Sequence, residues 1–140
     1  MKKSVVVFPL IFLVILFSCK KTIQKQEENA ALNIMTDGTW KVSQYLQDSV
    51  DITSTLSQYN FQFYANGTVT GTNGSVSATG TWTTNIANHS ITSAFPTGSG
   101  AVNELDAVWI ITDSSPDYVI AYTTIDSVTD NLKLEKNPTP

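Results

Sequence analysis

Residues 60–82, NFQFYANGTVTGTNGSVSATGTW, decide the fold class of this chain. Three β-rich runs are separated here by Asn66-Gly67 and Asn73-Gly74, dipeptides that accept the positive φ angles of tight hairpin turns. Side chains on a strand alternate between its two faces, so Phe61 and Phe63 share one face. The stretch therefore predicts a three-stranded antiparallel meander.

Short β-rich runs continue at regular spacing on both sides of this meander. Thr, Val, Ile and aromatic residues favour pleated, half-buried strands, and the turns between the runs are polar. We expect an all-β fold, a small antiparallel up-and-down eight-stranded barrel, with a β-sandwich as the alternative. The expected strands are 39–47, 58–64, 68–72, 76–84, 89–95, 105–113, 118–125 and 131–136.

Alternation also assigns each strand an inner and an outer face. The large apolar side chains must converge on one interior, because a single hairpin could not bury them stably. Those expected to point inward are Trp40, Val42, Tyr59, Phe61, Phe63, Val69, Trp82, Ile91, Phe95, Trp109, Ile111, Ile120, Tyr122, Leu132 and Leu134. Tyr45 and Tyr64 are expected on the outer face, where tyrosine rings can stack on sugars.

The first 18 residues have the anatomy of a cleaved signal peptide. A positively charged start precedes an almost wholly apolar stretch, which is shorter than the roughly twenty residues a membrane-spanning helix needs. Leu16-Phe17-Ser18-Cys19 then resembles a bacterial lipobox, in which the cysteine is acylated and the bond before it is cut. We expect Cys19 to carry lipid such as palmitate and to hold the protein on a membrane.

Four segments follow from these features: a signal peptide (1–18), a lipidated flexible tether (19–36), the barrel domain (37–136) and a tail (137–140). The tether is polar and cannot bury enough surface to fold alone. Lys20 and Lys21 follow the cysteine, where an acidic stretch would direct surface display. We therefore expect a lipid anchor in the Gram-negative cell envelope, on the periplasmic side of its membrane.

The charge of the domain excludes one class of partner. The chain has no Arg, and residues 37–136 hold three Lys against ten acidic residues, a formal charge of −7. Such a surface repels phosphate backbones, so we expect no binding to nucleic acid.

Catalytic chemistry has few candidates. His89 is the only histidine and Cys19 is the only cysteine, so neither a histidine-based triad nor a multi-histidine metal site can form. The carboxylates fall where turns are expected, and Asp caps turns through its own hydrogen bonds. We expect no enzyme activity, no metal and no cofactor.

Three segments resemble the lipocalins and the lipocalin-like domains of small bacterial lipoproteins. Gly38-Thr39-Trp40 is similar to the Gly-x-Trp motif that opens the first lipocalin strand, where the Trp seals one end of the barrel. Residues 108–122 resemble the paired later strands of the family, and residues 61–69 with Gly80-Thr81-Trp82 resemble the bacterial domains. The chain lacks the Arg that packs over the family's Trp, and its strands are shorter.

The resemblance, over about residues 37–136, implies structural roles for Gly38 and Trp40 and a barrel that holds a small apolar ligand or nothing. The candidate lining residues are Phe61, Phe63, Trp82, Trp109, Ile120 and Tyr122. A ligand should be uncharged or cationic, since no Arg can clamp an acidic head group. The alternative is a solid barrel whose outer surface binds another envelope protein or a glycan.

Two tripeptides point to modification. Asp48-Ser49-Val50 and Asp126-Ser127-Val128 resemble the Asp-Ser/Thr-apolar sequon of a bacterial O-glycosylation system that acts on exported proteins. Both fall at expected loops or strand ends. Ser49 and Ser127 are therefore candidate O-glycosylation sites.

Overall fold

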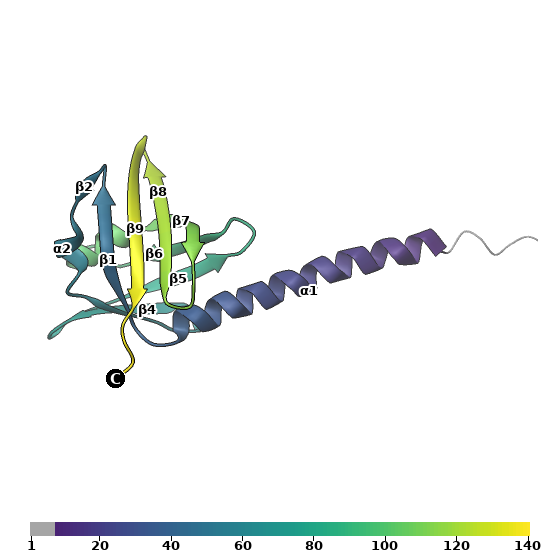
Figure 1. Ribbon diagram of the computed structural model, residues 1–140, viewed down its shortest axis with the longest axis horizontal. Coiled ribbons are helices and arrows are strands. Elements are labelled where there is room, and N and C mark those ends of the chain that lie inside the picture. The colour runs from purple at the N-terminus through teal and green to yellow at the C-terminus, as the bar shows by residue number, and fades with distance from the viewer. Residues whose placement is uncertain (1–7) are drawn as a thin grey trace, which may run out of the picture.

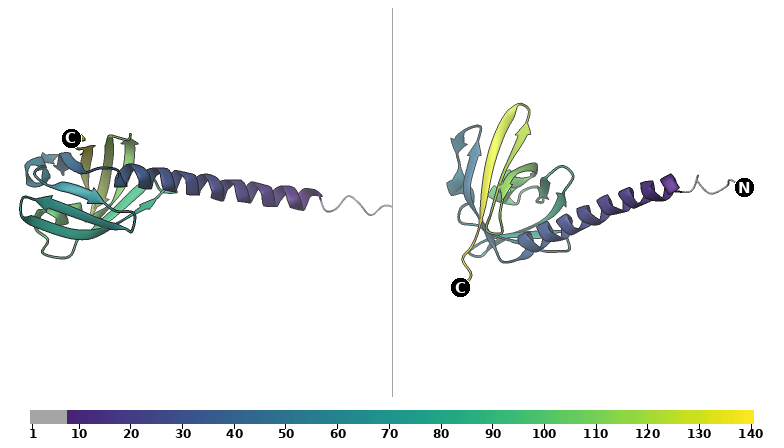
Figure 2. Two further views of the ribbon diagram at one scale, coloured as in Figure 1. Left: turned by 90° about the horizontal axis from the view of Figure 1, so that it is seen from below. Right: turned by 45° about the vertical axis from the view of Figure 1, so that its right-hand side comes forward.

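The computed structural model describes the backbone of residues 8–140 and the side chains of residues 21–140. A β-barrel is joined to one long helix that leads away from it (Figures 1 and 2). The elements are α1 (Phe8–Thr36), β1 (Trp40–Gln47), β2 (Val50–Asp51), α2 (Thr53–Leu56), β3 (Asn60–Phe63), β4 (Thr68–Asn73), β5 (Val76–Asn85), β6 (Ser90–Ala94), the 3-10 helix η1 (Gly100–Leu105), β7 (Ala107–Ser114), β8 (Tyr118–Ile125) and β9 (Val128–Lys136).

The barrel closes because β1 pairs with β9 along one edge and with β3 on the other. Strands β3 to β9 follow one another in sequence order, and every pair is antiparallel. The two-residue β2 only extends the end of β1. The predicted all-β, up-and-down, eight-stranded barrel is confirmed, and the sandwich alternative is wrong.

Most of the predicted inner face is buried. Edge-on ring contacts join Phe63 to Trp82, with centroids 5.2 Å apart. The predicted inward residues that are buried are Trp40, Val42, Tyr59, Phe61, Phe63, Val69, Trp82, Ile91, Phe95, Trp109, Leu132 and Leu134. Ile111 is half-buried beside a register shift in β7. Alternation therefore assigned the inner face correctly at these buried positions.

Strand β1 contains an irregularity that reverses its alternation. Its pairing with β9 shifts between Val42 and Gln44, as at a β-bulge. One extra residue moves every later side chain to the opposite face. Tyr45, predicted to face outward, is therefore 1% exposed inside the barrel. Tyr64 is 44% exposed on the outer face, as predicted.

The faces of β8 were predicted wrongly. Val119 and Ala121 are buried, whereas Tyr122 is 36% exposed and Ile120 only half-buried. Both faces of this strand are apolar, so alternation cannot choose between them. Register decides: β9 places its inward Leu134 and Leu132 opposite Val119 and Ala121. The smaller pair fits the space that those leucines leave.

Helix α1 runs through the segment that was expected to be a flexible tether. Residues 21–30 are exposed, but Leu32 and Ile34 pack on the barrel core and Met35 is 3% exposed. The structure differs from the expected tether because these apolar residues gain burial at the end of the barrel. Asn137, expected in the tail, also joins the domain: its backbone N–H donates to the carbonyl of Thr39, 2.8 Å away.

The backbone of residues 8–18 of the predicted leader belongs to α1, but the side chains of the leader are not among the described residues. Residues 1–7 and the Cys19 side chain lie outside the described residues. Within the part of the chain that is described, no helix combines the length and hydropathy needed to cross a membrane.

Candidate functional site

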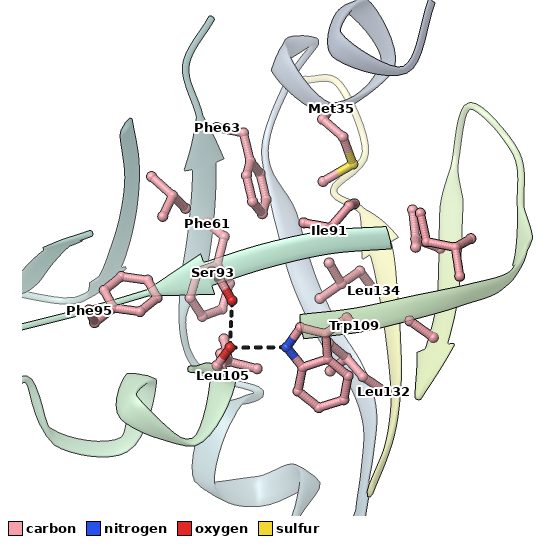
Figure 3. A pocket seen from close by; sticks show the side chains of 14 residues that line it. Met35, Phe61, Phe63, Ile91, Ser93, Phe95, Leu105, Trp109, Leu132 and Leu134 are labelled. Atoms are coloured by element: carbon pink, nitrogen blue, oxygen red, sulfur yellow. Dashed lines mark hydrogen bonds between the residues drawn. The ribbon is translucent and has the colours of Figure 1, made fainter. Parts of the chain in front are cut away.

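The barrel interior is nearly filled by its own side chains. The cavity inside the barrel has a volume of about 40 Å³ and an almost wholly apolar lining. Close packing continues around it: a Cβ at Gly71 would lie 2.9 Å from the ring of Phe61. The cavity is lined by Met35, Phe61, Phe63, Val69, Ile91, Ser93, Phe95, Leu105, Trp109, Ile111, Val119, Ala121, Leu132 and Leu134 (Figure 3).

Helix η1 closes the end of the barrel that lies farther from α1. Val102 is fully buried there, and Leu105 is 6% exposed. The Leu105 carbonyl accepts hydrogen bonds from Trp109 Nε1 (3.0 Å) and Ser93 Oγ (Figure 3). These bonds tie η1 to strands β6 and β7, so the plug is held by polar contacts as well as by burial.

The buried Tyr45 anchors the same end. Its hydroxyl donates to the carbonyl of Glu104 in η1 at 2.9 Å and lies 3.4 Å from Oδ2 of Asp130. Burial, followed by the negative charges of Asp130 and Glu104, raises the pKa of this tyrosine above its usual range. The phenol therefore stays neutral and acts as a donor, a structural role rather than the surface role expected for it.

The opposite end is sealed by Trp40 and Met35. Trp40 is 0% exposed, and its Nε1 donates to the Met35 carbonyl at 3.0 Å. Lys136 Nζ lies 5.2 Å from the centroid of the Trp40 ring. A cation thus covers this tryptophan although the chain has no Arg, which sequence reasoning missed because Lys136 is 96 positions away. Gly38 has a φ of 77°, which suits glycine at the turn before β1.

The six predicted ligand-lining residues are only partly brought together. Phe61, Phe63 and Trp109 line the cavity. Trp82 is buried but donates its Nε1 to the Tyr64 carbonyl at 2.9 Å, near the rim. Ile120 and Tyr122 belong to the outer face of β8 and do not line the cavity. Contact of any of these residues with a ligand stays a prediction.

A groove of about 230 Å³ lies where α1 meets the mouth of the barrel. Met35 lines both this groove and the inner cavity, so its side chain stands between the two spaces. Its lining combines apolar side chains with hydroxyl, amide and imidazole groups. The groove is lined by Ala31, Ile34, Met35, Thr84, Asn85, Ile86, His89, Ser90, Ile91, Ile111, Ser114, Ser115 and Val119. Sequence reasoning missed it because these residues come from several separate segments.

Two further polar candidates, His89 and Asp106, lie in the connections between elements of the barrel. His89 is exposed at the rim with a φ of 49°. Asp106 accepts hydrogen bonds from the backbone N–H of Phe95 (2.7 Å) and from Asn103 Nδ2 (2.9 Å), which tie the loop around η1 to β6. Among the described residues, no three His, Cys, Asp or Glu side chains gather as metal ligands would.

Both candidate glycosylation serines lie at hairpin tips. Ser49 joins β1 to β2 and Ser127 joins β8 to β9, and both are exposed.

These features define a class of protein: a small closed antiparallel barrel with a packed interior and a plug at each end. Compared by sequence, the chain matches no family model and no curated protein. Compared by structure, it is similar to a DUF4847 family protein from Bacteroides vulgatus, with a TM-score of 0.53 and 15% sequence identity. The match covers 79% of this chain and 99% of that one. At this identity the similarity shows the fold alone, and the resemblance to lipocalins stays a prediction.

Proposed function

We propose that this protein is a lipid-anchored, non-catalytic protein of the bacterial envelope whose barrel is a packed scaffold that binds a partner protein through its outer surface. One observation carries the proposal. The inner cavity of about 40 Å³ is far smaller than the roughly 300 Å³ or more of small-molecule pockets. The interior therefore stabilises the fold, and the outer surface of the barrel binds the partner protein.

An apolar strip on the outer face of β7 and β8 is the surface that best suits such a partner. Val108 and Tyr122 are 50% and 36% exposed, and half-buried Ile110 and Ile120 lie on the same face. Register pairs Ile110 with Tyr122, so the strip is continuous across the two strands. Because the domain carries a formal charge of −7, the partner should have an apolar patch with a basic rim.

The packed interior is tested by uptake of benzene into the purified protein, followed by NMR. Phe63→Ala removes a ring from the cavity wall, and apolar cavities of roughly 150 Å³ bind benzene. We expect saturable uptake by Phe63→Ala and none by the parent. Saturable binding of benzene inside the parent would contradict a solid core.

The strip is tested by placing a photo-crosslinking amino acid at position 122 in living cells, with position 76 as the control. Val76 is also exposed, at 54%, but lies on β5. We expect a protein adduct at position 122 that Val108→Asp abolishes and that high salt weakens. Equal adducts at both positions would argue against a defined surface, and a carbohydrate adduct would favour the glycan-binding alternative.

The groove beside Met35 favours a second candidate function, binding of a small, largely apolar molecule at the barrel mouth. Its volume of about 230 Å³ approaches the lower limit for ligand pockets, roughly 300 Å³. No Lys or Arg is present among the described residues that line it. A fatty-acid carboxylate would therefore lack a charged partner there, and an uncharged ligand suits the groove better.

Native mass spectrometry of the mature chain carrying Cys19→Ser separates these ligands. A monoacylglycerol should bind and the matching fatty acid should not. Ala31→Trp, which fills the groove, should abolish binding, whereas Ala94→Trp at an exposed position far along β6 should leave it unchanged. Tight binding of the fatty acid would overturn the charge argument.

A further inference from the structure

Two hairpin turns carry the same tripeptide in the same backbone conformation. Asp48-Ser49-Val50 joins β1 to β2, and Asp126-Ser127-Val128 joins β8 to β9. The φ angles of Asp and Ser are 46° and 67° in the first turn and 50° and 67° in the second. Strand register leaves only these two residues at the centre of each turn, which is the geometry of a type I′ hairpin.

Serine is an unfavourable residue at these positions. Positive φ at both central residues favours Asn-Gly or Asp-Gly, because a Cβ crowds the left-handed conformation. The chain does use glycine in the hairpin between β4 and β5, where Gly74 has a φ of 58° and precedes Ser75. Among the described residues, neither Ser49 Oγ nor Ser127 Oγ has a hydrogen-bonding partner. The two hydroxyls therefore make no hydrogen bond that would offset the strain of a serine at positive φ.

All three residues of each tripeptide are exposed to solvent. Asp, Ser and Val are exposed in each, and the two valines, Val50 and Val128, are 63% and 38% exposed. The turns lie at the end of the barrel away from α1 (Figure 1). They are also neighbours, since β1 pairs with β9 and the Asp48 N–H donates to Oδ1 of Asp130 at 3.2 Å. An enzyme could reach both tripeptides from one side without unfolding the barrel.

We propose that Ser49 and Ser127 form a paired O-glycan attachment site and that Asp-Ser-Val in this turn is the signal a glycosyltransferase reads. The donor is a sugar carried on a diphosphate. The serine Oγ bonds to the anomeric carbon as the bond from that carbon to the diphosphate oxygen breaks. The diphosphate leaves with the electron pair, and the seryl proton passes to a base on the transferase. This assignment rests on the exported location proposed above.

The full-length protein, isolated from the bacterium that encodes it, provides the test. Tandem mass spectrometry with electron-based fragmentation keeps O-linked groups on their residues. We expect sugar masses on Ser49 and Ser127, loss of one site in each single Ser→Ala variant and loss of both in the double variant. Alanine keeps a Cβ at the strained position, so the fold is unchanged. Asp126→Asn should abolish modification of Ser127. The turn should be kept, because Asn, like Asp, adopts a positive φ.

Ser75 is the control, and unlike Ser49 and Ser127 it does not have a positive φ. It is exposed in a two-residue hairpin and is followed by an exposed valine, but Gly74 stands where the other turns have Asp. We expect no sugar on Ser75 and no effect of Ser75→Ala. If Ser49 and Ser127 are unmodified in a chain whose leader has been removed, the glycosylation proposal is overturned but the proposed exported location is not. The same result in a chain that keeps its leader would overturn the exported location with it. A phosphate mass, or sugar on Ser75, would refute the assigned signal.

Discussion

Replacing Trp40 by alanine should lower the free energy of unfolding by about 3–5 kcal/mol, the usual cost of truncating a buried tryptophan. The side chain is 0% exposed, its Nε1 donates to the Met35 carbonyl at 3.0 Å, and Lys136 Nζ lies 5.2 Å from the ring. Small domains have a total stability of about 5–15 kcal/mol. The variant should therefore lose a large share of its stability.

More conservative substitutions separate the contributions of ring burial, the hydrogen bond and the Lys136 cation to the free energy of unfolding. Trp40→Phe keeps a ring but leaves the Met35 carbonyl without its donor, at a cost of about 1–3 kcal/mol. Lys136→Met keeps the aliphatic stem and removes the cation, which should cost about 0.5–1 kcal/mol. Because Lys136 also pairs with Asp37 at 3.2 Å, Asp37→Asn measures that surface contribution by itself.

Urea unfolding followed by circular dichroism is the appropriate assay, because it does not depend on the tryptophan that is removed. Val76→Ala, at a site 54% exposed on the barrel exterior, is the control and should change stability by less than about 0.5 kcal/mol. If Trp40→Ala unfolded at the parent's midpoint, Trp40 would not seal the barrel and the packing described here would be refuted.

Three further predictions concern other parts of the chain. Ser49→Gly and Ser127→Gly should each raise the free energy of unfolding by roughly 1 kcal/mol in the same assay, because glycine relieves the positive φ; lower stability would show that the serines serve the fold. The raised pKa of Tyr45 means that its stabilising contribution is complete below the ordinary tyrosine pKa of about 10 and is lost as the pH rises through the higher folded value. Tyr45→Phe should therefore flatten the alkaline loss of stability measured by urea unfolding at increasing pH, and an unchanged slope would contradict the assignment. Labelled palmitate fed to cells should enter the parent protein but not Cys19→Ser, and equal incorporation would rule out that cysteine as the lipid site.

The strands could be predicted from the sequence because their signals are local. Alternating aromatics such as Phe61 and Phe63 and turn dipeptides such as Asn66-Gly67 act within a few residues. The same reasoning failed where the deciding contact lies elsewhere in the chain. The bulge that turns Tyr45 inward arises in the pairing of β1 with β9, and the face of β8 depends on Leu132 and Leu134 of the next strand.

The candidate site was less predictable than the strands. Local pattern placed Phe61, Phe63 and Trp109 inside correctly, but it could not measure the space left between them. That space is a small difference between large volumes contributed by residues far apart in sequence. The mouth groove and the cation over Trp40 likewise bring distant segments together, so no local signal announces them.

By itself, then, the sequence determined the all-β class, the positions of the strands, and the acidic, arginine-free character of the domain. Each follows from composition or from short-range periodicity. Only the tertiary structure decided that the sheet closes through β1 and β9, that Met35 and η1 close the two ends of the barrel, and that the turns of Ser49 and Ser127 lie at the same end. The physical reason is that closure, register and packed volume are set by contacts between residues up to a hundred positions apart, which no local pattern encodes.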